Sequence, residues 1–404
     1  MALARTRQIG LKLESTAGTA ETLVAADFSM EIKDHQGGRE SATYERESVR
    51  GTLSRRPDAR AGSSRMGSQS FAMEMSGGSA ATVAKWGEAI QALGYGREAV
   101  KQIAISNTDN TESLRIGQVL GNALVQSSAT KTAIFVHATA DTIWILPTAG
   151  EFASSDTIYN YESTQFSADL DGNPTDGGHA FRPLSTTTAA PHKTVTIQEL
   201  NDGLSYQLIA GARGTGAIMM QVNQPPTLSI EMQGPLITAG SDATAASAFV
   251  VDVPVPPVVD NCRAGTISVR MSDGTLKTPL VTQVDFTLNN NVVNRPTAGG
   301  EQVGTSGYAL PMITDRTPTV SLDPEANLSD LDLHQLVLTG DLFSVESAAG
   351  TPAGANGLIK VWSPAAQLNA DLEPTARDGL DSYNIEAKLT GDDDNELYVF
   401  HVFA

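Results

Sequence analysis

The chain has 404 residues, of which 40% are hydrophobic, 18% are charged and 36 are glycine. This length is enough for two or three domains that each bury a core, and the low charge content argues against long exposed helices. The 46 acidic residues exceed the 27 lysines and arginines and give a net charge of −19, which argues against a general DNA-binding surface.

The N-terminal segment predicts two short strands and no secretory signal. Residues Gln8 to Leu13 read as one strand, and Phe28, Met30 and Ile32 begin a second alternating run. The basic residues near the N-terminus are not followed by the apolar run that a signal peptide needs. We therefore expect the protein to fold in the reducing cytoplasm where it is made.

A long basic hairpin is predicted between Asp34 and Gly67. This segment has almost no apolar periodicity, and strand alternation returns only at Ser68 to Met75. Two arms of about fourteen residues would each reach roughly 45 Å. A loop of this length cannot bury itself and needs a partner surface to become ordered. Its arginines are Arg39, Arg46, Arg50, Arg55, Arg56, Arg60 and Arg65.

These seven arginines depart from the acidic background, and they allow three interpretations. In a solvated loop they would be balanced by the neighbouring Glu40, Glu45, Glu47 and Asp58. A nucleic-acid site would interleave aromatic side chains, and only Tyr44 is present. We favour pairing with the acidic surface of a neighbouring subunit, because a guanidinium group can bind a carboxylate through two parallel hydrogen bonds.

Ser79 to Tyr95 predicts an amphipathic helix that packs on one face of a sheet. Ser79 or Thr82 can cap its start, and Gly94 can end it. Four apolar residues recur at the spacing of one helix stripe. They are Val83, Trp86, Ile90 and Leu93.

Residues 101–187 predict a small β domain inserted after this helix. Ala133 to Val136, Thr142 to Leu146 and Thr157 to Tyr161 look like short strands. Gly117 and Gly150 lie where small β-barrels turn. A polar stretch rich in Asp and Gly then ends the domain.

An antiparallel meander is predicted from Thr194 to Leu236. Four alternating runs are separated by three turn sequences, which we place at Asn201 to Gly203, Gly211 to Gly216 and Gln224 to Pro226. Each run presents apolar residues to one side only. The meander therefore has one buried face.

The second half of the chain repeats this order of elements. Asn327 to Gly340 predicts a second helix with an apolar stripe of Leu328, Leu331 and Leu338, capped by Asn327 or Ser329 and ended by Gly340. Strands joined by a long polar loop precede it, and a meander follows. We therefore expect a first unit at 1–100 and 188–245, with hairpin 34–67 and helix 79–95, the inserted domain at 101–187, and a second unit at 246–404.

No motif in the sequence points to catalysis. The six histidines share no metal-site spacing, no Gly-x-Ser-x-Gly sequence is present, and the Gly211 to Gly216 run lacks the ending of a phosphate loop. Acidic clusters at Asp169 to Asp176 and at Asp392 to Glu396 do not follow the EF-hand order, so solvated turns are favoured over calcium sites. We expect no catalytic, cofactor-binding or metal-binding residue, and hence no enzyme.

Two further features limit the classes of protein. Cys262 is the only cysteine, which excludes a disulfide framework or a cysteine-based zinc site within one chain. The most apolar window, Ala248 to Val259, is interrupted by Asp252 and three prolines, so we expect no membrane span.

Two segments carry a resemblance to a known family. One joins an Asp-Gly turn, a Gly-Ala-Arg-Gly-Thr run and a Gln-Pro-Pro turn into an alternating strand, and the other is Trp-Gly-Glu-Ala-Ile-Gln-Ala-Leu-Gly-Tyr after the basic hairpin. Together they resemble the tail tube (major tail) proteins of long-tailed, non-contractile bacteriophages, the siphophages. The resemblance covers roughly residues 1–100 and 188–404, and the inserted domain lies outside it.

The resemblance implies a structural virion protein of tube-fold β-sandwiches, each with a flanking helix. Such subunits self-assemble into rings, and the rings stack into a hollow tail tube through which DNA passes during genome ejection without specific binding. The implied partners are other copies of the chain, the tape measure protein, the tail terminator and the distal tail protein. The implied location is the virion tail, assembled in the host bacterial cytoplasm, with no cofactor and no membrane.

The family usually builds each ring from six tube folds, so two folds per chain predict a homotrimeric ring with pseudo-sixfold symmetry. A homohexamer is the alternative. We expect an acidic lumen that repels phosphate, and an inserted domain on the tube exterior. A β-rich carbohydrate-binding surface or secreted protein is the alternative function, since it would share the turns and the acidity.

Overall fold

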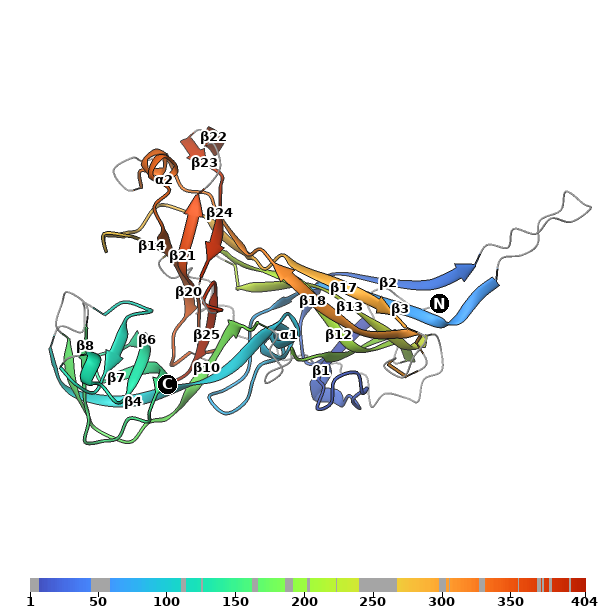
Figure 1. The fold of residues 1–404 in the computed structure, drawn as a ribbon, viewed down its shortest axis with the longest axis horizontal. Helices are drawn as coiled ribbons and strands as arrows, with labels where there is room; N and C mark the ends of the chain where they lie inside the picture. The colour runs from blue at the N-terminus through green and yellow to red at the C-terminus, as the bar shows by residue number, and fades with distance from the viewer. Residues whose placement is uncertain are drawn as a thin grey trace, which may run out of the picture.

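The protein is mostly β-strand, with two short α-helices in the part that the structure describes (Figure 1). The structure is a computed structural model. It describes residues 7–404 except 45–58, 110–113, 125, 162–165, 186–191, 202–203, 223, 240–266, 298–302, 305, 327–330, 355, 369–371, 373, 378–379 and 392–393. No described helix is long and apolar enough to cross a membrane. The predicted all-β class with minor helix is confirmed.

Six antiparallel strands form a first sheet in the order β1–β11–β12–β13–β3–β2. Alternate residues of these strands are apolar, so one face buries side chains such as Phe71, Ile218 and Ile230. The strands are β1 (Arg7–Leu13), β2 (Ile32–Tyr44), β3 (Ala59–Glu74), β11 (Val195–Asn201), β12 (Leu204–Gln221) and β13 (Thr227–Ala239). The predicted first strand is confirmed, whereas the second begins at Ile32 because Phe28 lies in a 3₁₀ turn, η2 (Ala25–Phe28), packed on Leu23 and Leu200.

Six further strands pair in the order β14–β20–β21–β24–β19–β16. In each of the two sets a short strand comes first along the chain, two arms of a hairpin follow, and a helix precedes three more strands. The second set is β14 (Ser268–Met271), β16 (Gln283–Thr287), β19 (Thr319–Leu322), β20 (Phe343–Gly350), β21 (Leu358–Leu368) and β24 (Ile385–Thr390). Short strands β15 (Leu276–Lys277), β22 (Pro374–Arg377) and β23 (Leu380–Tyr383) flank it. We call the two sets the first and second units.

The two units join edge to edge through β16 and the last part of β12, residues Ala217 to Gln221, which extends beyond the pairing with β11 and is an edge there. In this junction Ile218 lies opposite Phe286 and Met220 lies opposite Val284. All four side chains are buried in one hydrophobic core that continues from the first unit into the second. The units are therefore parts of one folded body with a shared core.

The second hairpin continues outward from the second unit. Beyond β16 and β19 its arms become β17 (Asn290–Pro296) and β18 (Tyr308–Arg316), and they stay paired with each other. Contacts with β12, β13 and β3 place this outer part against the first unit. Figure 1 shows β17 and β18 alongside β12, β13 and β3.

The turn predicted at Gly211 to Gly216 is wrong, because β12 runs without reversal through the whole segment. Gly211 has a φ of 70°, and the pairing register shifts between Ile209 and Arg213, so the glycine makes a bulge in a continuous strand. The buried Glu14 carboxylate accepts a hydrogen bond from the Gly211 N–H at 2.6 Å. Three strands therefore replace the four predicted for the meander, and residues 202–203 of its first turn lie outside the described residues.

The first helix, α1 (Lys85–Ala92), is shorter than predicted. Ser79 and Thr82 do not cap it, because the helix begins only at Lys85; their hydroxyl groups lie 2.7 Å apart and bond to each other in the preceding loop. Ala84 occupies the cap position without a side-chain hydrogen bond. The chain leaves the helix at Gly94, which has a φ of 88°, as the sequence predicts.

The second helix, α2 (Leu333–Thr339), ends at Gly340 in the left-handed conformation, which confirms the predicted stop. Its start is later than predicted, with the Asp332 side chain accepting from Gln335 N at 3.0 Å. The predicted stripe is wrong at Leu338, which is 81% exposed, because the later start turns Leu333 and Leu336 toward the core instead. Asn327, Leu328 and Ser329 lie outside the described residues.

A small barrel lies between the long strands that follow α1. β4 (Tyr95–Asp109) and β10 (Thr175–Pro183) pair near the first unit, and the barrel at their far end has its own core. It contains β5 (Val119–Gly121), η4 (Gln126–Ser128), β6 (Thr132–Ala138), β7 (Thr142–Ala149), β8 (Thr157–Asn160) and β9 (Ser167–Leu170), which include the three short strands predicted here. Part of the polar stretch predicted to end the domain is strand β10, so β4 and β10 run from the barrel to the first unit without a break.

The C-terminal strand β25 (Tyr398–Val402) connects the barrel strands to the second unit. It pairs with β10 on one side and with β21 on the other. The Trp144 indole N–H donates to the Phe403 carbonyl at 2.8 Å, and Gly117 packs against the Trp362 ring. The barrel is therefore fixed against the end of the chain.

Candidate functional site

The face of the sheet opposite the core is polar and acidic. On β13, β16, β19 and β24 most of the residues that alternate with buried apolar ones carry hydroxyl, amide or carboxylate groups. We call this surface the polar face. Its described carboxylates are Asp34, Glu74, Glu231, Asp285, Asp323 and Glu386, and its described lysines are Lys33 and Lys388. The polar face is therefore net negative.

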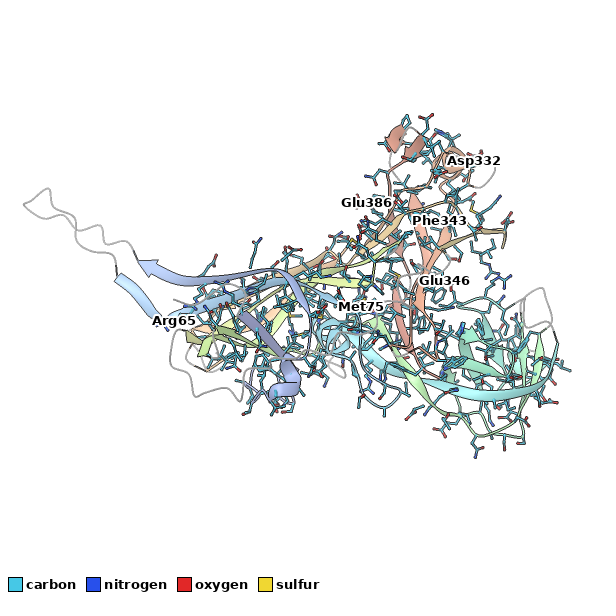
Figure 2. The ribbon with its side chains drawn as sticks, turned by 180° about the vertical axis from the view of Figure 1, so that it is seen from behind. Arg65, Met75, Asp332, Phe343, Glu346 and Glu386 are labelled. Atoms are coloured by element: carbon cyan, nitrogen blue, oxygen red, sulfur yellow. The ribbon has the colours of Figure 1, made fainter. Side chains whose placement is uncertain are left out.

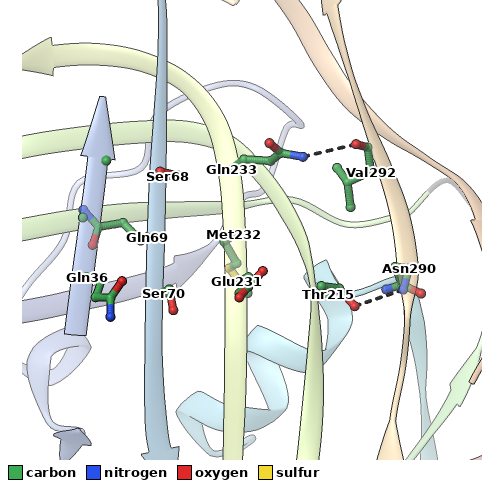
Figure 3. A pocket seen from close by; sticks show the side chains of 12 residues that line it. Gln36, Ser68, Gln69, Ser70, Thr215, Glu231, Met232, Gln233, Asn290 and Val292 are labelled. Carbon is green, nitrogen blue, oxygen red and sulfur yellow. Dashed lines mark hydrogen bonds between the residues drawn. The ribbon is translucent and has the colours of Figure 1, made fainter. Parts of the chain in front are cut away.

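A groove of about 500 Å³ crosses the polar face between the first hairpin and β17 (Figure 3). Gln36, Ser70, Glu231 and other polar residues line it. Two hydrogen bonds tie its far wall to the first unit, from Gln233 Nε2 to the Val292 carbonyl at 3.2 Å and from Asn290 N to Thr215 Oγ1 at 2.9 Å. The amide and hydroxyl groups of the groove can exchange hydrogen bonds with water, and the Glu231 carboxylate repels phosphate.

Charges on the polar face are organised differently in the two units. Lys33 Nζ lies 2.8 Å from Glu74 Oε1 in the first unit. In the second unit burial raises the pKa of Asp285, the nearby Asp323 carboxylate raises it further, and a hydrogen bond from Gln283 opposes both. The second unit thus keeps two like charges close together.

No group of three or more His, Cys, Asp or Glu side chains that could hold a metal occurs within the described ranges. Three of the six histidines, His179, His192 and His401, are buried packing residues, whereas His334 is exposed. His401 contacts the Trp86 ring with 4.9 Å between centroids, and burial lowers its pKa to about 4. A neutral imidazole at this place suits a structural role in the core.

Of the seven predicted arginines, the structure describes the side chains of Arg39 and Arg65 only, and neither lines the polar groove. Arg39 lies on β2 and is exposed. Arg65, labelled in Figure 2, lies on β3 and is also exposed. β13 accompanies β3 only as far as Met66, so beyond that point the two arms pair with each other. Arg60 lies on β3 without a described side chain. Arg46, Arg50, Arg55 and Arg56 lie outside the described residues.

Three of the four apolar residues predicted for the packing helix are fully buried in the core. Trp86, Ile90 and Leu93 are about 1% exposed, and Val83 is partly buried just before the helix. Trp86 also contacts Phe181, with 5.6 Å between ring centroids. The helix therefore packs both the sheet of the first unit and the barrel strand β10.

Sequence reasoning missed the role of Asn290. Its side chain is buried and donates to the Leu93 carbonyl at 2.7 Å and to the Gly214 carbonyl at 3.0 Å. It thereby fixes the second hairpin to the end of α1 and to β12. The sequence offers only a polar Asn-Asn-Asn run here, and the fold alone brings a distant helix end to it.

Strand β2 is an open edge of the first unit. Within the described residues it pairs in register with β3 alone, whereas the corresponding strand of the second unit, β16, pairs with both β19 and β12. An edge strand leaves a row of backbone donors and acceptors available for another chain. Comparison with known proteins adds no relative, since neither a protein-family model nor a curated protein matches the chain.

Proposed function

We propose that the chain is a tail tube subunit of a siphophage-like particle, a structural protein that polymerises into stacked rings. The observation that carries this proposal is the repeated six-strand order, with the two units joined edge to edge through β12 and β16. A chain that already joins two equivalent sheets at their edges has the geometry of two neighbours in a ring. The tandem tube folds, rather than one sandwich, are part of the proposal.

Ring closure follows from repeating the internal junction between chains. The open edge of β2 in one protomer would take the place that β16 takes inside the chain, against the second unit of the next protomer. Closing all edges in this way removes the exposed strands that otherwise promote aggregation. Six units close the ring if each chain supplies two, so we propose a homotrimer with pseudo-sixfold symmetry.

The polar face would line the lumen. Its carboxylates outnumber its lysines in the described residues, so the potential along the channel is negative and DNA phosphates are repelled instead of captured. Transport of DNA then needs no specific binding residue. The barrel of β5 to β9, held by β25 at the side of the second unit, would lie on the exterior.

Counting chains per ring tests the proposal. Purified protein imaged by electron microscopy without imposed symmetry should give rings or tubes with three chains in each ring. Six chains in each ring would reject the trimer, and a monodisperse monomer with affinity for sugars would reject the tube in favour of the carbohydrate-binding alternative. A lumen mapped with net positive charge would reject the proposed passage mechanism.

The first hairpin provides a second test of polymerisation. Deleting residues Arg46 to Arg65 removes much of the hairpin but leaves the part of β3 that pairs with β13. We expect a folded, soluble subunit that does not form tubes, because stacking would rest on the hairpin reaching the next ring. Circular dichroism and light scattering check the fold, and normal tube formation by this variant would contradict the role of the hairpin.

A further inference from the structure

The second hairpin shows how a hairpin of this protein docks on a neighbouring unit. Asn290 bonds to the carbonyl at the end of α1, Ile313 packs on Gly94, and Arg213 Nη1 donates to the Pro311 carbonyl at 2.7 Å. At the far end of the hairpin, the Ser306 carbonyl accepts from Arg65 N at 2.9 Å. The end of α1 is therefore covered by the hairpin of the other unit.

Strand pairing gives the residue of the first hairpin that corresponds to Asn290. Phe71 pairs with Ile230 in the first unit as Val320 pairs with Ala387 in the second. Phe71 and Val320 are therefore equivalent positions. Gly67 lies four residues before Phe71, and Arg316 lies four residues before Val320, so Gly67 and Arg316 are equivalent as well. The partner of Gly67 is Arg39, and the partner of Arg316 is Asn290. Arg39 therefore occupies the place of Asn290.

The end of α2 is the surface that corresponds to the covered end of α1. Both helices end at a glycine with positive φ, Gly94 and Gly340. Next to Gly340, Leu338 is 81% exposed and Leu342 is 45% exposed. The two leucines expose apolar side chains at one helix end, where a docked partner could cover them.

The charge at this surface fits an arginine. Residues 317–359 contain no lysine or arginine, while six of them are acidic. Asp332 and Asp341 are exposed at the two ends of α2. Figure 2 places Asp332 and Arg65 at different ends of the molecule, so one chain cannot bring its own first hairpin to its own α2.

We propose that the base of the first hairpin docks on the α2 end of the next protomer in the same ring, with Arg39 beside Asp341 and the exposed Leu338 and Leu342 covered. The occupant is a second copy of this chain. The contact rests on the proposed ring, because it repeats between chains what the second hairpin does inside one. The guanidinium group of Arg39 can donate to carbonyl groups at the helix end and to the Asp341 carboxylate.

A charge exchange tests this contact. Arg39→Glu and Asp341→Arg should each raise the protein concentration needed for ring formation by about tenfold or more, because like charges then face each other. The double variant should recover most of the loss. Glu151→Arg, which reverses an exposed acid on the barrel, is the matched control and should assemble normally. Normal assembly of both single variants would overturn the contact.

Cross-linking distinguishes a contact within a ring from one between rings. Arg39→Cys with Leu338→Cys, in a Cys262→Ala background, should give covalent species of up to three chains on oxidation. Species larger than three chains would place Arg39, at the base of the hairpin, against the next ring and overturn the proposal. If the variants and the wild type alike form no rings in electron micrographs, the proposed function itself fails. Rings without the cross-link would reject only the docking contact.

Discussion

The two units bury corresponding apolar residues in their cores, but they differ at their strand edges and outer faces. The row Ile32–Met73–Leu228 of the first unit corresponds to Val284–Leu322–Ile385 of the second, and each row joins three neighbouring strands. Immediately beyond these rows the side chains diverge. Core positions stay apolar because both sheets bury the same face, while edges and outer faces change with the surface that covers them.

The clearest difference lies at the edge strands. β16 is enclosed between β12 and β19. One further hydrogen bond lies at each end of its pairing with β12. Leu288 N donates to the Gly216 carbonyl at 2.8 Å, and Val222 N donates to the Thr282 carbonyl at 3.0 Å. Backbone groups of a strand alternate between its two sides, so Val284 faces β12. The equivalent Ile32 of β2 faces the open edge.

Proline substitution at these equivalent positions should give the largest difference. Val284→Pro removes a hydrogen bond from the enclosed junction and should lower the free energy of unfolding by about 3 kcal/mol or more. Ile32→Pro should cost much less in the isolated subunit but prevent ring formation. Urea unfolding and electron microscopy measure the two effects. Val284→Ala and Ile32→Ala correct for the lost side chains.

Equal destabilisation by both prolines would show that β2 is as enclosed as β16 in the subunit, which would break the comparison. Normal rings from Ile32→Pro would mean that β2 is not a subunit edge in the assembly. The two measurements are independent, because the first needs only the monomer.

Local patterns in the sequence predicted elements, and long-range pairing decided their boundaries. Phe71 and Ile230 alternate with polar residues and mark their strands directly. The Gly211 bulge could not be told from a turn, because the deciding partner is the carboxylate of Glu14, far away in the sequence. Leu338 was assigned to the buried stripe because the residues before Leu333 continue the apolar spacing, although the helix starts only after Asp332.

The polar face was predictable only as an overall acidity. Net charge indicates that a lumen would repel phosphate, but the assignment of Glu231, Asp285 and Glu386 to one face needs the strand register. The open edge of β2 was also not predictable from residues. It depends on which of two equivalent strands has a neighbour, and pairing between distant segments determines that.

A second difference concerns the two helices. The ring of Trp86 on α1 contacts His401 of β25, whereas the outer side of α2 has the exposed Leu338. Burial lowers the His401 pKa from 6.5 to about 4, so the unfolded chain binds more protons between these values. The stability that depends on neutral His401 is complete above pH 6.5 and falls as the pH drops toward 4, with a loss of about 2 kcal/mol at pH 5.

His401→Phe should therefore reduce the dependence of stability on pH between 6.5 and 4, while His137, whose pKa burial also lowers to about 4, retains part of it. The phenyl ring keeps the contact with Trp86 but cannot take up a proton. Urea unfolding at pH 7.5 gives the constant cost of the substitution, including the lost hydrogen bond to the Asn356 carbonyl. An unchanged slope from pH 6.5 to pH 4 in this variant would show that His401 does not control the acid sensitivity.

The smallest difference between the two units is one charged residue on the polar face, which is a lysine in the first unit and an aspartate in the second. Lys33 and Glu74 follow Ile32 and Met73 in the first unit, and the same positions in the second unit hold Asp285 and Asp323. The first pair attracts, with 2.8 Å between its charged groups, and the second repels. An opposite pair at this site would stabilise the subunit, so the retained acids fit the proposed role of the polar face as a lumen that repels DNA.

Asp285→Asn should raise the midpoint of thermal unfolding at pH 7. The raised pKa of Asp285 means that the folded state disfavours its charge, so the stability contributed by the protonated form is lost as the pH rises above the ordinary value of 3.8. The gain from asparagine should shrink as the pH approaches 3.8, because the wild-type carboxyl is then protonated as well.

Glu386→Gln, on an exposed acid of the same face, should change stability by less than about 0.5 kcal/mol. A lower midpoint for Asp285→Asn at pH 7 would mean that the second unit gains from this charge, and the acidity of the polar face would then have a structural explanation without any lumen.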